Sequence, residues 1–148
     1  SLVVTRYSFH HFPHPAAVLA EMIRVCRPGG RILVADVAMP AEKSQAFDRM
    51  EVIRDPSHVH ALTSGEFEHL IGQSGLENCR RTQYEVEIEL EAQIKASFPL
   101  PGGAERLRAM ITDDIGIDHL CITPQRKNGQ IWYSIPIRIY VGNKRMGS

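Results

Sequence analysis

The sequence predicts an α/β fold on a mostly parallel sheet, and three observations support this prediction. An apolar run from Leu2 to Val4 and an almost continuous one from Ile32 to Ala35 are typical of strands. Between them lies an amphipathic helical stretch that Pro28-Gly29-Gly30 closes. A strand, a helix and a strand joined by short links form a right-handed βαβ unit. Such a sheet binds its ligand outside the carboxyl ends of its strands, here residues 5–11 and 36–39.

The first strand and helix follow from local patterns. The strand runs into polar residues from Thr5 to Ser8, so we expect the end of a buried strand there. Pro15 suits the first turn of a helix, where its missing N–H is not needed. The apolar residues between Val18 and Cys26 recur at helical spacing and predict one buried face, which includes Val25.

Two more helices are expected before residue 76. The first covers residues 40–54 and ends at Asp55, because the residue before Pro56 disfavours the helical region. Thr63, with Glu66 three residues later, forms a capping box that opens the second helix. Gly75 then supplies the residue with a left-handed backbone that often closes a helix.

The middle of the second half alternates in polarity and then becomes helical. From Tyr84 to Leu90 apolar and acidic residues alternate, which is typical of a half-solvated strand at or near a sheet edge. Short helices are expected at residues 91–98 and 104–114, separated by Pro101-Gly102-Gly103.

A hairpin completes the predicted fold. Asn128-Gly129 is a strong signal for a tight turn, and apolar residues alternate behind it from Ile131 to Val141. Pro136 interrupts this last strand and excludes a central position in the sheet, unless it lies at a bulge or where strand pairing lapses.

The segment from His10 to Asp36, HHFPHPAAVLAEMIRVCRPGGRILVAD, resembles the central part of class I S-adenosylmethionine-dependent methyltransferases of the small-molecule type. Arg24-Val25 followed by Pro28-Gly29-Gly30 makes this likeness specific, and it continues more weakly through residues 54–59 and 63–75. The resemblance implies a Rossmann-like sheet made of the family's strands four to seven. The seventh strand would be antiparallel and inserted between the fifth and the sixth. A helical insertion at residues 91–120 would shape the acceptor pocket.

The sequence departs from that family in its cofactor motif. No Gly-x-Gly-x-x-Gly occurs, although the family holds S-adenosylmethionine with a glycine-rich turn. We therefore expect residues 1–148 to be the C-terminal portion of a single methyltransferase domain. Alone, this portion is expected to bind the cofactor weakly or not at all and to be inactive. A non-catalytic binding or oligomerisation module on a methyltransferase-like scaffold is the alternative function.

Candidate site residues lie at the expected strand ends. His10 and His11 are candidate general bases for a hydroxyl, thiol or amine acceptor, and His58 is expected near the lid of the site. Arg6 is a candidate contact for the cofactor's carboxylate or an anionic acceptor, and Thr5 is expected to contribute backbone contacts. The alternatives are structural: one histidine caps a helix and another packs beneath it, and Arg6 forms a surface ion pair.

Metal binding is the alternative role for the histidines. The candidate ligands are five histidines: His10, His11, His14, His58 and His60. The sequence has no metalloprotease motif, and none of the three cysteines is spaced to join the histidines. We therefore expect no native metal.

Composition limits the possible partners and location. The 148 residues are 43% hydrophobic and 23% charged, with a formal net charge of zero, so no electrostatic footprint for nucleic acid or an anionic membrane is present. No apolar stretch is long enough for a membrane span. Three cysteines without CxxC spacing favour a reducing cytoplasm.

The same reasoning predicts self-association. The family's fourth strand normally pairs with its first, so residues 2–7 would form an unprotected sheet edge in this chain. We expect a homodimer or a domain-swapped assembly through residues 1–7.

Overall fold

The computed structural model describes residues 1–147 and shows a mixed sheet with flanking helices. The strand order is β1-β2-β5-β3, and β4 pairs with β5. The strands are β1 (Leu2–Arg6), β2 (Arg31–Val37), β3 (Glu77–Glu89), β4 (Gln125–Lys127) and β5 (Gln130–Asn143). The helices are α1 (Pro15–Val25), α2 (Ala41–Arg54), α3 (Ser64–Gln73), α4 (Leu90–Ala96) and α5 (Gly103–Asp113), with a 3-10 turn at Phe9–His11.

The predicted βαβ unit is confirmed. β1 and β2 are parallel, with Val4 opposite Leu33, and α1 connects them with Pro15 in its first turn. Two details of the expectation are wrong. β1 is not buried, because Leu2 and Val4 are 58% and 52% exposed. Val25 is 54% exposed as well, because it lies at the end of α1 and outside the stripe that packs on the sheet.

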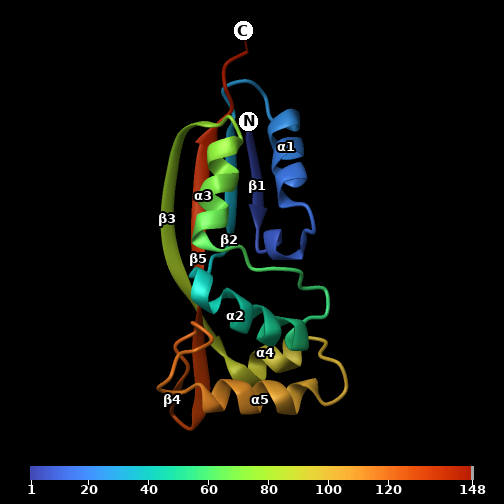
Figure 1. Cartoon of the computed structure of the whole chain (residues 1–148), viewed down its shortest axis with the longest axis vertical. Helices are drawn as coiled ribbons and strands as arrows, with labels where there is room; N and C mark the ends of the chain where they lie inside the picture. Colours follow the sequence, from blue (N-terminus) through green and yellow to red (C-terminus); the bar gives the residue numbers. More distant parts are fainter. Residues whose placement is uncertain (148) are drawn as a thin grey trace.

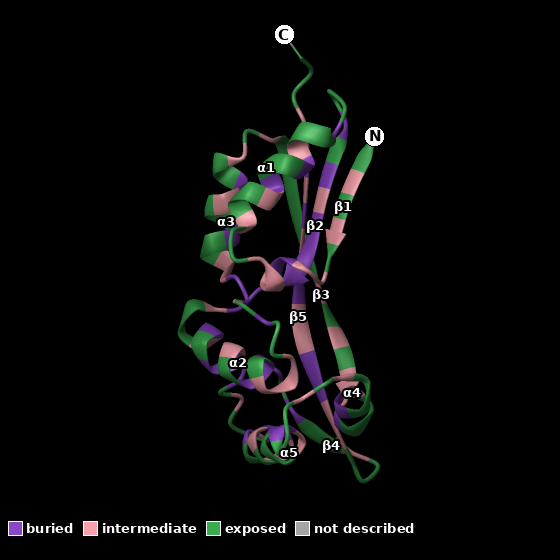
Figure 2. Ribbon diagram, turned by 90° about the vertical axis from the view of Figure 1, so that its right-hand side faces the viewer, coloured by how far each residue is buried: buried purple, intermediate pink, exposed green. Residues whose placement is uncertain are grey.

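The reason is that helices cover only one face of this half of the sheet. α1 and α3 lie on the same side of the strands, and Figure 2 shows no helix over the opposite side of β1 within the described residues. The covered face packs around Phe9, Leu19 and Phe67, and the Phe67 ring stacks on Tyr140 at 5.2 Å.

The last strand is central and antiparallel, as the resemblance implied. β5 pairs with β2 on one side and with β3 on the other. Pro136 is tolerated because strand pairing lapses beside it. The last residue pair between β2 and β5 is Val37 with Ile137, and the Pro136 carbonyl accepts from the Ala38 N–H just beyond that pair (3.3 Å).

β3 is an edge strand, as its alternation predicted, but it begins at Glu77, seven residues earlier than Tyr84. At the hairpin between β4 and β5, Asn128 and Gly129 have φ angles of 51° and 77°, which a tight primed turn requires. The capping box of α3 is also present. The Thr63 hydroxyl accepts from the Glu66 N–H (3.1 Å), and the Glu66 carboxylate accepts from the Thr63 N–H (2.7 Å).

The lower half of the molecule in Figure 1 is a second packed region with its own group of helices. α2, α4 and α5 gather at the end of the sheet where β1 and β2 finish, with a core that includes Phe47, Met50 and Leu107. Residues 91–120 contain most of α4 and all of α5. No helix within residues 1–147 is long and apolar enough to cross a membrane.

Candidate active site

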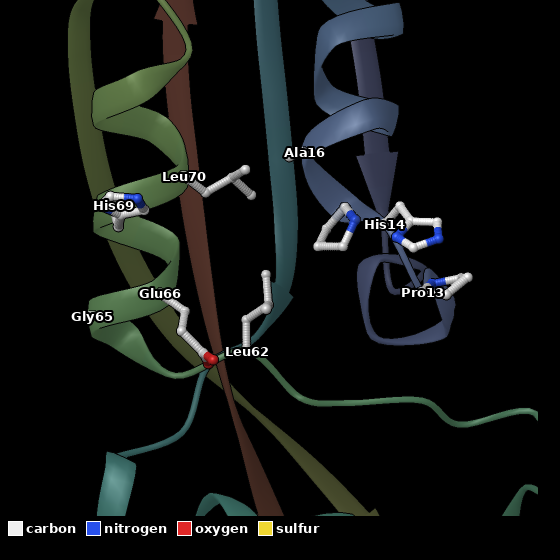
Figure 3. Close-up of a pocket in the computed structure, with 9 residues that line it drawn as sticks. Pro13, His14, Ala16, Leu62, Gly65, Glu66, His69 and Leu70 are labelled. Carbon is white, nitrogen blue, oxygen red and sulfur yellow. The ribbon is translucent and has the colours of Figure 1, made fainter.

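Two hollows are candidates for a ligand site. The larger, of about 510 Å³, lies between α3 and the start of α1. Figure 3 shows Leu62 and Leu70 extending into this space, while the rings of His14 and His69 lie on opposite sides of it. It is a mainly apolar groove, without converging reactive groups. The second hollow, of about 310 Å³, is lined by residues at the carboxyl ends of β1 and β2.

We call this second hollow the strand-end pocket. It lies where an open α/β sheet is expected to bind its ligand. Its apolar wall consists of Val37, Phe47, Val86, Ile88, Ile135 and Ile137. Its polar lining consists of Tyr7, His10, His11, Asp36, Glu51, Arg54, Asp55 and Gln93. A mostly apolar cavity with a few converging polar groups is the usual form of a small-molecule site.

His10 and Asp36 form a hydrogen-bonded dyad in this pocket. Asp36 is the penultimate residue of β2 and is 1% exposed, and its Oδ1 lies 2.6 Å from His10 Nδ1. The same carboxylate accepts from the backbone N–H groups of Phe9 (2.7 Å) and Val37 (2.8 Å). The carboxylate therefore fixes both the 3-10 turn after β1 and the ring of His10. Because a carboxylate only accepts, His10 Nδ1 carries the proton and Nε2 is the basic nitrogen.

His11 lies beside His10 but contacts the loop after α2. Its Nδ1 is 3.1 Å from both the carbonyl and the hydroxyl oxygen of Ser57, and its Nε2 is 4.0 Å from Asp55. The Ser57 hydroxyl donates to Asp55 (2.6 Å) and holds the pKa of that carboxyl below its ordinary value. The centroids of the two histidine rings are 4.1 Å apart.

His58 lies beneath the pocket and not at its lid, which differs from the expectation for this loop. Its side chain is fully buried, with its ring centroid 5.5 Å from that of His10 and 6.3 Å from that of Phe47. His58 Nε2 is 2.7 Å from Asp48 Oδ1, and its Nδ1 has no hydrogen-bond partner among the described residues. His58 therefore supports the floor of the site.

Asp48 of α2 connects this floor to the start of α3. Besides His58, it accepts from the Ala61 N–H (2.8 Å) and contacts His60 Nδ1 (2.7 Å), and His60 Nε2 contacts Glu66 (2.9 Å). Burial opposes the charge on His60, but the two carboxylates outweigh it and raise its pKa. Burial also opposes ionisation of Asp48 and Glu66, and their hydrogen bonds lower both pKa values.

Thr5 and Arg6, the two residues expected to contact the cofactor, differ in the contacts that their side chains already make. The Thr5 hydroxyl is paired with that of Ser8, and Thr5 pairs with Val34 of β2 in the sheet. Arg6 donates to the Tyr7 phenol oxygen (3.0 Å), and its guanidinium lies 4.4 Å from the centroid of the Tyr7 ring. The Tyr7 oxygen is 2.6 Å from that of Tyr84.

A buried ion pair in the pocket wall was missed from the sequence. Glu51 is 3% exposed, and the Arg54 guanidinium donates to its carboxylate, at 2.6 Å from Nη2 to Oε2. Burial opposes the charge on Arg54, but Glu51 outweighs it and raises the Arg54 pKa. An acidic residue inside the apolar stripe of α2, with an arginine three positions later, was the available signal.

The structure therefore brings His10, His11 and His58 together, with Arg6 and Thr5 at the neighbouring strand end. It adds Asp36, Asp48 and the Glu51–Arg54 pair to them. Within residues 1–147, no three histidine, cysteine, aspartate or glutamate side chains converge as a possible metal-binding group. The arrangement provides a basic imidazole, oriented by a buried carboxylate, beside an apolar cavity.

Comparisons with known proteins indicate the family. A family model described as a methyltransferase domain matches residues 1–80. The Escherichia coli protein YafE is 39% identical over 77 residues, which are 51% of this chain and 37% of YafE. The Bacillus subtilis methyltransferase YcgJ is 26% identical over 97% of this chain and 58% of its own length. The chain therefore spans about a third to three fifths of these relatives.

Solved structures show the same fold. The crystal structure of Bacillus subtilis YcgJ superposes with a TM-score of 0.84 at 20% identity, over 99% of this chain and 64% of that one. A more distant structure is Haemonchus contortus phosphoethanolamine N-methyltransferase 2, solved with phosphomonomethylethanolamine and S-adenosylhomocysteine. Its TM-score is 0.55 at 11% identity, over 97% of this chain and 33% of that one.

Proposed function

Because the chain belongs to the family of methyltransferase domains, we propose that the protein transfers a methyl group from S-adenosylmethionine to a small-molecule acceptor in the strand-end pocket. The observation that supports this proposal best is the His10–Asp36 dyad. It lies at the carboxyl ends of two parallel strands, beside an apolar cavity of about 310 Å³.

The dyad suits removal of a proton from the acceptor. Methyl transfer is an in-line displacement, so the protein contributes alignment and proton removal without a covalent intermediate. His10 Nε2 would accept the proton of the acceptor's O–H, N–H or S–H, while the cofactor would supply the methyl group and leave as S-adenosylhomocysteine when its sulfur–methyl bond breaks. The imidazolium that results is stabilised by the buried carboxylate of Asp36.

The other pocket residues position the acceptor. The apolar wall, which includes Val37, Phe47 and Ile137, holds its body. The Glu51–Arg54 pair and Gln93 of α4 supply polar groups at the far side, so the helical insertion takes part in acceptor selection. His58 acts through His10, since it supports that ring and is not itself among the lining residues.

The described residues fit only the reactive end of the cofactor. Thr5 and Arg6 lie at the end of β1, where Arg6 offers a cation, and S-adenosylmethionine would supply the electrophilic methyl group there. Glycines with positive φ lie at helix ends and in the β4–β5 hairpin. None lies between a strand and the helix that follows it within residues 1–147. Weak cofactor binding by this chain alone remains our expectation.

The test is formation of S-adenosylhomocysteine by the full-length protein with a panel of phenols, thiols and amines. We expect His10→Gln to lower kcat by about 10²- to 10⁴-fold, since a positioned general base contributes that much. His119→Gln is the matched control, because His119 is exposed, lines neither hollow and has no side-chain hydrogen bond to residues 1–147. Acceptor binding without any turnover would instead favour the non-catalytic module.

A further inference from the structure

Three polar side chains at the end of β1 form a cluster that the proposed proton transfer does not use. Arg6, Tyr7 and Tyr84 are joined by an Arg6 to Tyr7 hydrogen bond (3.0 Å) and by the contact between the two phenol oxygens (2.6 Å). We call them the phenol cluster. Tyr7 lines the strand-end pocket, in the same lining as His10. Tyr84 comes from the edge strand β3, so the cluster spans the width of the sheet.

Counting donors and acceptors shows that one phenol proton is left over. The Tyr7 oxygen accepts from Arg6, and one phenol O–H is used between the two tyrosines. If Tyr7 donates to Tyr84, the Tyr84 O–H has no acceptor, and if Tyr84 donates, the Tyr7 O–H has none. Either way, the cluster offers a hydrogen-bond donor that no residue within 1–147 satisfies.

The charge of the cluster is also unpaired. Arg6 forms no ion pair with a carboxylate of residues 1–147. Two carboxylates of the pocket are paired with other side chains instead. These are Asp36, bound to His10, and Glu51, bound to Arg54. A free phenol proton beside an unpaired guanidinium favours an anionic oxygen over a neutral or cationic group.

The backbone holds the cluster in place at a conformational cost. Tyr7 has a φ of 55°, a left-handed conformation that bulky residues avoid, and its N–H donates to the Ala35 carbonyl (2.9 Å). Strain of this kind collects at binding and catalytic sites. Here it turns the chain immediately after β1, at the residue that lines the pocket.

We propose that the phenol cluster is a carboxylate-binding subsite of the strand-end pocket. The carboxylate would accept the free phenol proton and lie against Arg6, with the attached apolar group along the wall at Val37 and Ile137. This inference rests on the proposed function, since it names the class of ligand that the methyl-transfer site would take. The carboxylate comes either from the acceptor or from the amino-acid end of the cofactor.

The test measures binding by the 148-residue chain and does not depend on turnover. NMR titration with benzoate should shift the ring signals of Tyr7 and Tyr84 in a saturable way, while the isosteric neutral benzamide should bind about tenfold more weakly. Arg6→Gln should weaken benzoate binding about tenfold without unfolding the protein, because Arg6 is exposed. Arg80→Gln, an exposed arginine of β3, is the matched control and should leave binding unchanged.

The two tyrosine variants separate the cluster from a merely apolar pocket. Tyr7→Phe removes the phenol of the cluster that lines the pocket, together with the oxygen that Arg6 contacts, and should lower the preference for benzoate most. Tyr84→Phe leaves the Tyr7 O–H beside Arg6 and should keep most of that preference. Equal binding of benzoate and benzamide, or equal loss in Tyr84→Phe and Tyr7→Phe, would overturn the proposal.

The source of the carboxylate follows from a competition experiment with the same chain. If the cofactor supplies it, S-adenosylhomocysteine should displace benzoate, while methylthioadenosine, which lacks the amino-acid group, should not. If the acceptor supplies it, neither nucleoside should displace benzoate, even at a concentration at which NMR shows S-adenosylhomocysteine bound to the chain. Both results keep the carboxylate subsite, and displacement by methylthioadenosine alone would contradict it.

Discussion

Asp36→Asn tests whether one buried carboxylate both stabilises the fold and orients His10 in the site. Asp36 is 1% exposed and accepts three hydrogen bonds. His10 Nδ1 and the Val37 N–H lie against Oδ1, at 2.6 Å and 2.8 Å, and the Phe9 N–H lies 2.7 Å from Oδ2. Asparagine has a single oxygen, so it can keep the first two bonds only if its NH₂ group faces the Phe9 N–H.

The expected loss of stability follows from these contacts. Leaving a buried donor at Phe9 unpaired costs about 1–3 kcal/mol. The two retained bonds become neutral, roughly half as strong as charge-assisted ones, which removes about another 1 kcal/mol. The sum is about 3 kcal/mol, a large part of the roughly 5–15 kcal/mol that stabilises a domain. The variant should also lower methyl transfer, because no carboxylate then stabilises protonated His10.

Urea denaturation followed by circular dichroism measures this loss. With an m-value of about 2 kcal/mol/M, the midpoint should fall by about 1.5 M. Asp113→Asn is the matched control, because Asp113 is exposed at the end of α5, and it should change stability by less than about 0.5 kcal/mol. A midpoint shift below about 0.5 M in Asp36→Asn would refute the view that this carboxylate organises the turn after β1.

Four further outcomes are expected. Glu51→Leu should cost about 3 kcal/mol, since it leaves Arg54 partly buried and unpaired, and adding Arg54→Met should recover most of that loss in the same denaturation assay. Thr63→Ala should lower the unfolding free energy by about 1 kcal/mol through loss of the α3 cap. The raised pKa of His60 stabilises the fold below the ordinary histidine pKa of 6.5, and this is lost as pH rises through the folded-state pKa. The lowered pKa of Glu66 stabilises it above its ordinary pKa of 4.5, and this is lost as pH falls through the folded-state pKa. Both effects are therefore present between pH 4.5 and pH 6.5, where thermal melts should show that they add at most about 1 kcal/mol to the free energy of unfolding. His60→Gln should remove this contribution, and a wild-type stability that is the same inside and outside this pH range would contradict it. The exposed edge of β1 leads us to propose that the 148-residue chain dimerises through residues 1–7, and light scattering showing only monomer at high concentration would count against this.

Local patterns were enough to place most elements of the fold. The turn at Asn128-Gly129, the cap at Thr63 and the alternation that begins at Tyr84 each depend on neighbouring residues in the chain. The sheet order followed from the family resemblance of the segment from His10 to Asp36, while the βαβ pattern itself indicated the strand ends where a site would lie. Burial was predicted less well. Leu2 and Val4 are apolar but exposed, because burial depends on what packs over a strand and not on its own composition.

The composition of the site could be predicted only in part. Arg6 ends β1 and His10 and His11 follow that strand, so all three were identifiable from the sequence. The partners that give them a role are far along the chain: Asp36 is 26 residues from His10, and Tyr84 is 77 residues from Tyr7. His58 was expected at a lid, but its ring lies inside the protein beside that of His10, because its Nε2 is hydrogen-bonded to Asp48 of α2.

The sequence by itself determined the α/β class, the βαβ unit and the family likeness, because these depend on periodicity and short-range motifs. Only the tertiary structure decided which histidine is hydrogen-bonded to a buried carboxylate, that Glu51 and Arg54 pair in the lining of the pocket, and that two tyrosines leave one donor free. The physical reason is that protonation and hydrogen bonding depend on distances of a few ångströms between residues from different strands and helices. Pairing of β1, β2, β5 and β3 sets those distances, and no local pattern contains them.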